Sequence, residues 1–367
     1  MKIILPALTL HNTRVLVLIY VLLGMVFAAY ADEHADGDRR QENVSALFQS
    51  HERLTMRLEA PFRKLVRKRG EDRPYSEAAL IYKDGAENDV RVDLKIRVRG
   101  KYRAKKEICR FPPLKLNFNK KNLADTIFNG EDKLKLVTHC KSSSKYEQFV
   151  LLEYLNYRMQ NLLTDYSLRA RLATIEYYDT DSKKVTDTQT GFFIEDQGRM
   201  SVRVAAQRVK TKRIGKEYYN QDQLHLATIF EYMLGNTDYS VVLGPADDDC
   251  CHNIIPLQAG DGQLIPVPYD FDATGIVNPS YVSPPEKLGI RSLRQRLYRG
   301  YCQNSEGFKK SFAVFHEHRD AIFDLYNSQA GLASRTLKST LSYLEKFYES
   351  ISDENKIISE FIDKCRK

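Results

Sequence analysis

Strict alternation of apolar and polar residues in the first third of the chain is the feature that most limits its fold. From Val90 to Gly100 the sequence VRVDLKIRVRG places an apolar side chain at almost every second position. Successive residues of a β-strand point to opposite faces, so this segment predicts a strand with one buried face. Similar strand-like runs, TMRLEA, AALIYKDG, PPLKLNF and DKLKLVTHC, lie between residues 54 and 140. We therefore expect an antiparallel hairpin or meander here.

Helical periodicity begins at SSSKYEQFVLLEYLNYRMQNLL and dominates the chain after Ser305. Between these regions, two strands are predicted around a turn at 181–184, and a small hairpin is predicted in NIIPL, AGDG and LIPVPYDFD. This order predicts an α+β fold of two lobes with a cleft between them. We expect a β-rich lobe with one helix at 46–198 and a mainly helical lobe, carrying the hairpin, at 199–367.

The N-terminus has the pattern of an export signal. Lys2 and Arg14 are the only charged residues before the apolar run VLVLIYVLLGMVF, and Ala-Tyr-Ala follows at 29–31. This predicts a signal peptide at 1–31, cleaved near Ala31, and a polar tether at 32–45. An uncleaved signal anchor is the alternative. We expect a periplasmic or secreted protein with no integral membrane span after cleavage.

Export makes disulfides the expected state of the six cysteines. Cys109 and Cys140 flank two consecutive apolar strands, so we predict that they pair. A second bridge is predicted from Cys302 to Cys250 or Cys251.

The formal net charge is +8, and Lys and Arg are scattered along the chain. Such a balance favours anionic partners. The chain has no zinc finger, no RNA-binding signature and no basic helix with heptads, so we do not expect nucleic acid among them.

An ordered set of acids and one Asn suggests chemistry. Asp238 follows a predicted helix, Asn253 opens a strand, and Asp270 and Asp272 close the next strand. In phosphoryl transfer one carboxylate orients the attacking hydroxyl, while an Asn and a second Asp hold Mg²⁺. The plainer interpretation is a turn cap, a bend residue and solvated acids. His252 is a candidate base or ligand, although a lone His is more often a packed or surface residue.

A nucleotide site also needs a cation for the phosphates, held by a carboxylate. Lys115 lies in a predicted strand and Glu147 in the first turns of the following helix. Taken singly, Lys115 is an ordinary exposed-face residue, and Glu147 is explained by the helix dipole.

Together these segments resemble the spore coat protein H (CotH) family of atypical kinases, and more distantly HipA-like and lipid-kinase-like folds. The similar pieces are KIRVRG with the following Tyr-Arg, FPPLKLNF, DKLKLVTHCKSSSKYEQFVLLEYL, TGFFIED, MLGNTDYS and LIPVPYDFDATG, across about residues 90–275. The resemblance implies a two-lobed atypical-kinase-like fold that binds ATP or another nucleotide with Mg²⁺ or Mn²⁺. The roles it implies are phosphate binding by Lys115, or alternatively Lys135, pairing of that lysine by Glu147, catalysis by Asp238, metal binding by Asp270 and Asn253, and a place near the adenine for Glu195.

The chain departs from that pattern in two respects. The catalytic Asp of such kinases precedes the metal-binding Asn by about five residues, whereas Asp238 and Asn253 lie fifteen positions apart, which implies an inserted loop within 240–251. No GxGxxG loop is present. In addition, an exported protein meets little ATP.

The predicted function is therefore phosphate transfer to a hydroxyl of a protein or an anionic surface polymer. The alternatives are a non-catalytic pseudokinase or envelope-associated module that binds an anionic polymer in the cleft or along 199–216, and a metal-dependent phosphoesterase that uses Asp238, Asp270 and Asp272.

Overall fold

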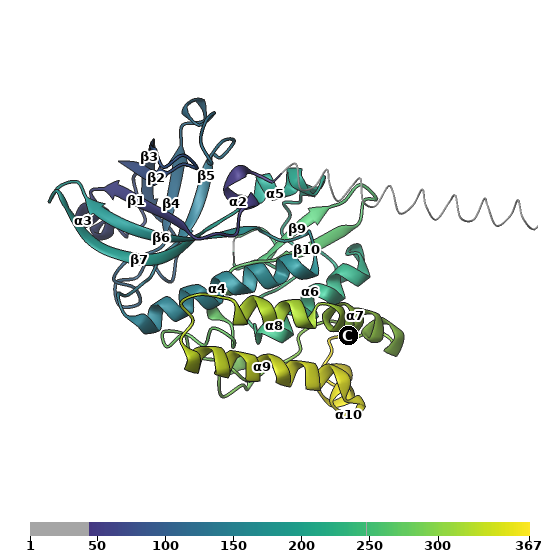
Figure 1. Cartoon of the computed structure of the whole chain (residues 1–367). Helices are drawn as coiled ribbons and strands as arrows, with labels where there is room; N and C mark the ends of the chain where they lie inside the picture. Colours follow the sequence, from purple (N-terminus) through teal and green to yellow (C-terminus); the bar gives the residue numbers. More distant parts are fainter. Residues whose placement is uncertain (1–43, 247) are drawn as a thin grey trace, which may run out of the picture. The chain divides into compact units, whose positions relative to one another are not determined.

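Seven β-strands from the first half of the chain close into a barrel (Figure 1). In spatial order they are β1 (Leu54–Ala60), β2 (Ser76–Lys83), β3 (Asp89–Val98), β4 (Leu114–Phe118), β5 (Lys133–Val137), β7 (Lys184–Ile194) and β6 (Ala170–Asp179). Neighbouring strands are antiparallel except β1 and β6, which run parallel with Leu54 beside Ala173. The β1–β6 pairing joins the two edges of the sheet and so leaves no unpaired edge strand.

The predicted strands are confirmed, and their alternating apolar residues are buried. On β3 the buried side chains are Val92, Leu94, Ile96 and Val98, and those between them are partly or fully exposed. The buried residues of β4 are Leu114, Leu116 and Phe118. This period of two is what a strand with one face in a closed core requires.

Helix α4 (Ser144–Leu163) links β5 to β6 and is confirmed at its predicted position. It contacts β6 and β7 of the barrel as well as α8 (Arg319–Asn327), so it is buried along most of its length. The other long helices are α6 (Gln221–Leu234), α7 (Ser305–Glu317) and α9 (Ser334–Ser352). The short ones are α2 (Ala46–Gln49), α3 (Phe62–Arg67), α5 (Gln197–Arg203) and α10 (Glu354–Lys356), the last continuing into a π-helical turn at Ile357–Ile362.

A second, three-stranded antiparallel sheet lies outside the barrel. It consists of β8 (Gln207–Arg208), β9 (Ile254–Gln258) and β10 (Leu264–Pro268). The β9–β10 pair is the predicted hairpin. Next to it the loop within 240–251 packs on a small apolar core of its own, which includes Ile214, Tyr219, Val241, Cys250 and Cys251.

The expected two-lobed kinase-like fold, with a β-rich lobe and a helical lobe, is wrong. The protein instead has a closed, mixed seven-stranded barrel accompanied by helices. The error arose at the β1–β6 contact, because Met56 and Ile175 pair across more than a hundred residues. Local alternation predicts each strand but carries no information on which distant strand closes the sheet.

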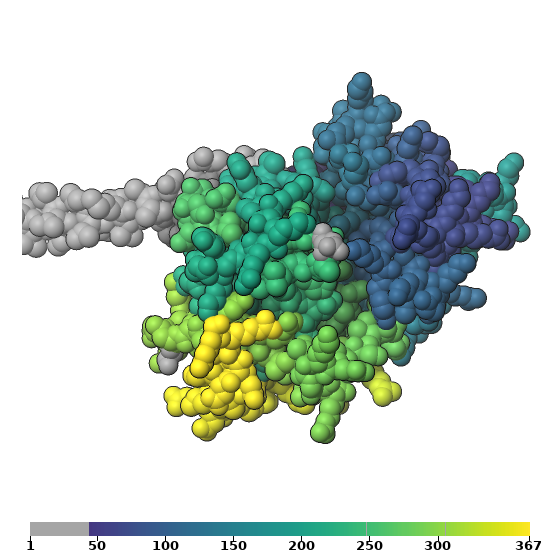
Figure 2. Space-filling view, turned by 180° about the vertical axis from the view of Figure 1, so that it is seen from behind, coloured from purple at the N-terminus to yellow at the C-terminus, as the bar shows by residue number. Residues whose placement is uncertain are grey.

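The computed structural model describes residues 44–246 and 248–367. The predicted signal peptide and most of the predicted tether lie outside these residues. Ser45–Lys367 forms one unit, and the expected boundary between 198 and 199 falls inside it. In Figure 2 the purple and blue residues of the barrel lie beside green residues from the middle of the chain, and the yellow C-terminal residues lie at the lower edge.

Candidate functional site

A pocket of about 750 Å³ brings together three of the residues predicted from sequence, Asp238, Asn253 and Asp270. Its walls include the loop after β3, the loop after α6, the entry to β9, the exit from β10 and residues between 282 and 293. The other residues that line it include Arg99, Lys101, Arg103, Thr237, His252, Tyr269, Asp272, Val282 and Leu293.

Asp238 is placed by the end of α6. The helix ends at Gly235, whose left-handed φ of 67° lets its N–H bond to the carbonyls of Glu231 and Tyr232. A Cβ at Gly235 would lie 2.1 Å from the hydroxyl of Tyr343, so a side chain does not fit there. The turn continues with the Asp238 N–H donating to Oδ1 of Asn236 at 2.9 Å, which directs the Asp238 side chain to the pocket.

The carboxylate of Asp238 is paired with His252. The Nε2 of His252 donates to Oδ1 of Asp238 at 2.7 Å. That hydrogen bond lowers the pKa of Asp238 and raises the pKa of His252, because each charged form stabilises the other. Asn253 Nδ2 donates to the Asp238 carbonyl at 2.7 Å and to Oδ2 at 3.2 Å. The pocket therefore holds a hydrogen-bonded Asp–His–Asn group.

The inserted loop explains the long spacing between Asp238 and Asn253. Ser240 and His252 exchange backbone hydrogen bonds of 2.9 and 3.1 Å, so the two ends of the inserted loop lie side by side. The loop is fastened further where the Cys250 N–H donates to the Thr211 carbonyl at 2.7 Å. Asn253 consequently lies beside Asp238 despite the fifteen positions between them.

Asn253 and Asp270 both have left-handed backbone, with φ of 53° and 65°. Such a conformation costs about 1–3 kcal/mol for a non-glycine residue, and it persists where surrounding contacts fix it. Here Tyr269 donates its N–H to the Asn253 carbonyl, and the Asp270 N–H donates to the Tyr157 hydroxyl, both at 3.0 Å. The Asp270 carboxylate accepts no hydrogen bond from any described residue.

Beneath the pocket one arginine lies between two carboxylates. Arg103 Nε lies 2.9 Å from Asp272, and its two Nη atoms donate to Glu153 at 3.1 and 3.3 Å. The side chains are 8%, 17% and 2% exposed for Arg103, Asp272 and Glu153. Burial raises the pKa of Asp272 to about 8 and also raises that of Glu153. Both pKa values rise because one arginine can balance only one of the two buried carboxylates. The pair therefore retains one proton.

Two cations are attracted to Asp270, and one of them lines the pocket. Arg99 lines the pocket, and its Nε is buried without a hydrogen-bond partner among the residues that the structure describes. Lys135 lies beside it, with Nζ 5.0 Å from the ring centre of Tyr269. Burial, and then repulsion from Arg99, lower the pKa of Lys135 to about 8, while attraction to Asp270 opposes the change.

The structure does not bring Lys115 and Glu147 together. Lys115 is the cross-strand neighbour of Lys135, but Arg97, Lys133 and Asp196 are among its main charged neighbours. Glu147 accepts a hydrogen bond from Thr190 on β7 at 2.7 Å. Six residues along α4 correspond to about 120° around the helix. Glu153 therefore lies on the face of α4 that is turned toward the pocket, and Glu147 lies on a different face.

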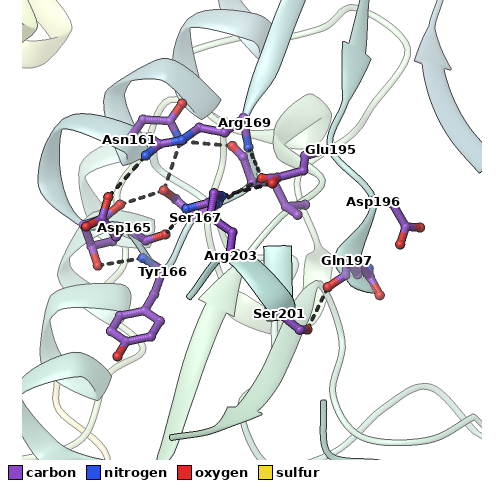
Figure 3. Close-up of polar contacts among 12 residues, drawn as sticks. Asn161, Asp165, Tyr166, Ser167, Arg169, Glu195, Asp196, Gln197, Ser201 and Arg203 are labelled. Carbon is purple, nitrogen blue, oxygen red and sulfur yellow. Dashed lines mark hydrogen bonds and ion pairs between the residues drawn. The ribbon is translucent and has the colours of Figure 1, made fainter. Parts of the chain in front are cut away.

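Glu195 lies outside the pocket, in a buried polar cluster (Figure 3). Arg203 donates to both of its carboxylate oxygens at 3.0 and 2.9 Å, and the Arg169 N–H donates to it at 2.9 Å. Arg203 also donates to the carbonyls of Asp165 and Ser167. The cluster therefore ties the end of β7 and helix α5 to the connection between α4 and β6, and this occupies the Glu195 side chain.

No role was predicted for Arg99, Arg103 or Glu153, and His252 was a candidate base or ligand without a predicted partner, with a packed or surface residue as the plainer interpretation. The Arg-Gly and Tyr-Arg pairs after β3 were part of the family resemblance, which was the available signal for the two arginines. For Glu153 and His252 the sequence carried no such signal, since their partners are distant in the chain or lie across the inserted loop.

Three disulfides join all six cysteines. Cys109–Cys140 pairs as predicted, whereas Cys302 bonds to Cys365 and not to Cys250 or Cys251, which bond to each other. This cysteine usage fits an exported protein. Among the described residues no helix is long and apolar enough to cross a bilayer.

The described residues contain no group of three or more His, Cys, Asp or Glu side chains arranged to hold a metal ion. No protein-family model matches the chain. A search of curated proteins found no significant match.

Proposed function

We propose that the protein is an exported phosphotransferase that uses a nucleotide and a divalent metal ion in the pocket around Asp238, Asn253 and Asp270. One observation carries the proposal: Asp270, whose carboxylate accepts no hydrogen bond from a described residue, shares this pocket with Arg99, a cation that attracts it but forms no ion pair with it. A metal ion would bind the Asp270 carboxylate, and Arg99 would attract the phosphate that the ion carries. The segments around these residues resemble the CotH family, which points to the same chemistry, although the closed barrel departs from the fold that this resemblance implies.

Asp238 is the orienting carboxylate in this proposal. Its pairing with His252 keeps it ionised, and an ionised carboxylate accepts a hydrogen bond from an incoming hydroxyl. The same pairing favours the protonated form of His252, whose positive charge keeps Asp238 ionised. Lys135 and Arg99 hold the phosphates, and we favour Lys135 over Lys115 because Asp270 is among the main charges that act on Lys135 but not among those that act on Lys115.

The residues present fit Mg²⁺ or Mn²⁺. Hard divalent cations take oxygen ligands, and they commonly combine one or two protein ligands with substrate phosphates and water. Asp270 would provide a carboxylate oxygen and Asn253 its Oδ1, since Nδ2 is already used by Asp238. A bound ion there would neutralise phosphate charge. A site of this kind does not require three acidic or His ligands from the protein.

Two other functions have less support. A phosphoesterase that uses Asp238, Asp270 and Asp272 as ligands needs a free Asp272, whereas Asp272 is paired with Arg103 and has a raised pKa. A non-catalytic module that binds an anionic polymer does not account for the strained backbone at Asn253 and Asp270.

Thermal unfolding of the mature chain with nucleotides and Mg²⁺ or Mn²⁺ tests the proposal. A ligand bound only by the folded state raises the Tm. Asp270→Asn should abolish the metal-dependent shift, because Asn keeps the left-handed backbone but removes the charge. Lys135→Ala should reduce it more than Lys115→Ala does. Asp125→Asn, which changes an exposed carboxylate, is the matched control and should respond as wild type. If no nucleotide shifts the wild-type Tm with either metal, the proposal is wrong.

The remaining part of the proposal concerns export. We propose that the segment 1–31 is cleaved near Ala31 and that the mature protein is periplasmic or secreted. Its acceptor is a hydroxyl of a protein or an anionic surface polymer. N-terminal sequencing of the protein recovered from the producing cell should begin near Asp32, and recovery of an intact N-terminus would support a signal anchor.

A further inference from the structure

A second groove, of about 950 Å³, adjoins the candidate site. It lies between the start of α4, the segment that follows the Asp270 turn, and the start of α9. In Figure 1 both helices begin on the same side of the molecule. The side chains along it are cationic, uncharged polar or apolar, and they include Lys145, Phe149, Val282, Arg291, Leu293, Arg294, Arg335 and Thr336.

The charge of this groove is of one sign. Four cationic residues line it, Lys145, Arg291, Arg294 and Arg335, and no Asp or Glu is among its lining residues in the described part of the chain. None of the four is in an ion pair with a described residue, and Arg294 instead lies 4.5 Å from the ring centre of Tyr343 and donates to the Ser339 carbonyl. Close like charges without counter-charges repel one another and attract an anion.

The nearest acid on α4 does not neutralise the groove. Glu147 is hydrogen-bonded to Thr190 of the barrel and is not among the groove residues. The positive ends of the dipoles of α4 and α9 add to the four charges, since Ser144 and Lys145, and Arg335 and Thr336, lie in the first turns of these helices.

The groove leads into the site pocket. Val282 and Leu293 line both of them, and Ser283 and Pro285 of the pocket lie next to Pro284 of the groove. A chain seated in the groove therefore approaches Asp238 and Asp270 from one end.

We propose that this groove, lined by Lys145, Arg291, Arg294 and Arg335, binds an acidic peptide segment of a protein acceptor. The identification of the bound peptide as the acceptor rests on the proposed function. Carboxylates of the peptide contact the four cations, and its apolar side chains contact Phe149, Val282 and Pro284, which are only partly buried. That mixture of cations and apolar side chains favours a polypeptide over a polysaccharide, which has no comparable apolar groups.

Fluorescence anisotropy with a short labelled peptide of Glu, Leu and Ser tests the groove, without nucleotide or metal. Binding should weaken by about tenfold or more in an Arg291→Glu, Arg335→Glu double variant, because two attractions become repulsions. The matched control is Lys121→Glu with Lys309→Glu, which lie outside the stretch 199–216 as well. It makes the same charge change at two exposed cations outside the groove and should bind as wild type. Circular dichroism and Tm values establish that both variants are folded.

The proposal is overturned if the control variant loses binding and the groove variant does not, or if the same peptide with Gln in place of Glu binds equally well. It is also overturned if dextran sulfate binds through the groove residues while the peptide does not, since the occupant is then a polymer. Asp270→Asn should leave peptide binding unchanged. If the peptide binds but no nucleotide raises the Tm, the groove proposal stands and the proposed phosphotransferase function is wrong. If a nucleotide raises the Tm but the peptide does not bind, the proposed function stands and the groove proposal is wrong.

Discussion

Replacing Glu153 by Gln should reduce the pH dependence of stability. In the folded protein Asp272 and Glu153 share Arg103, and burial raises the pKa of Asp272 to about 8, well above its ordinary value of 3.8. Between these two pH values the folded state keeps a proton that the unfolded state has lost. Stability from this group is therefore present at low pH and falls as the pH rises toward 8.

The magnitude follows from the width of that window. One proton difference changes the free energy of unfolding by about 1.36 kcal/mol per pH unit. Between pH 5 and 8 the loss amounts to about 4 kcal/mol, an upper bound because the Asp272 side chain retains 17% exposure. In Glu153→Gln, Arg103 has a single carboxylate partner and one repulsive charge is gone, so Asp272 ionises at lower pH and the decline should become shallower. Burial and the charge of Asp270 still raise the pKa of Asp272.

Urea unfolding at several pH values between 5 and 8.5 measures this, with the disulfides intact. At pH 5 the variant should be less stable than wild type by about 1–3 kcal/mol, the cost of the lost charged hydrogen bonds. The difference should shrink or reverse by pH 8. Glu147→Gln on the same helix is the control. Its free energy of unfolding should change with pH as in wild type, because the Glu147 carboxylate does not contact Arg103. Parallel curves for wild type and Glu153→Gln would refute the shared-proton interpretation.

Three further outcomes are expected. Arg203→Met should lower the free energy of unfolding by about 3–5 kcal/mol in urea, because the buried Glu195 carboxylate loses its charge partner. A loss no larger than that caused by replacing an exposed arginine would show that this ion pair does not stabilise the fold. Removing Cys109–Cys140 by a double Ala substitution should cost about 4 kcal/mol, since the bridge closes a loop across 31 positions, and reductant should then have less effect on the Tm. Glu231→Gln should flatten the Tm profile between pH 5 and 8, because burial raises the pKa of Glu231 to about 8 and the folded state keeps a proton there that the unfolded state has already lost. An unchanged profile would place the Glu231 carboxyl in a more solvated site.

Site residues could be predicted from the sequence where neighbouring residues carry the pattern that places them. Asp238, Asn253 and Asp270 each follow or begin a strongly patterned element, a helix that ends at Gly235 or a hairpin strand, so their meeting was predicted from element order. The partners of these residues were not. Glu153 and Arg103 lie fifty positions apart and meet only through packing of α4 under the β3–β4 loop.

The fold shows the same division. The sequence by itself determined the individual strands and helices, because alternation and helical periodicity are local consequences of which side chains can be buried. It also determined the Cys109–Cys140 pairing, since two flanking residues of adjacent strands are necessarily close.

Only the tertiary structure decided that the sheet closes. The parallel pairing of β1 with β6 depends on backbone hydrogen bonds between segments more than a hundred residues apart, to which many alternating strands are equally suited. The same holds for His252, whose charge partner is chosen by how the loop within 240–251 folds back. Contacts between distant segments depend on how the whole chain packs. The residue pattern of a segment indicates only which of its own side chains are buried.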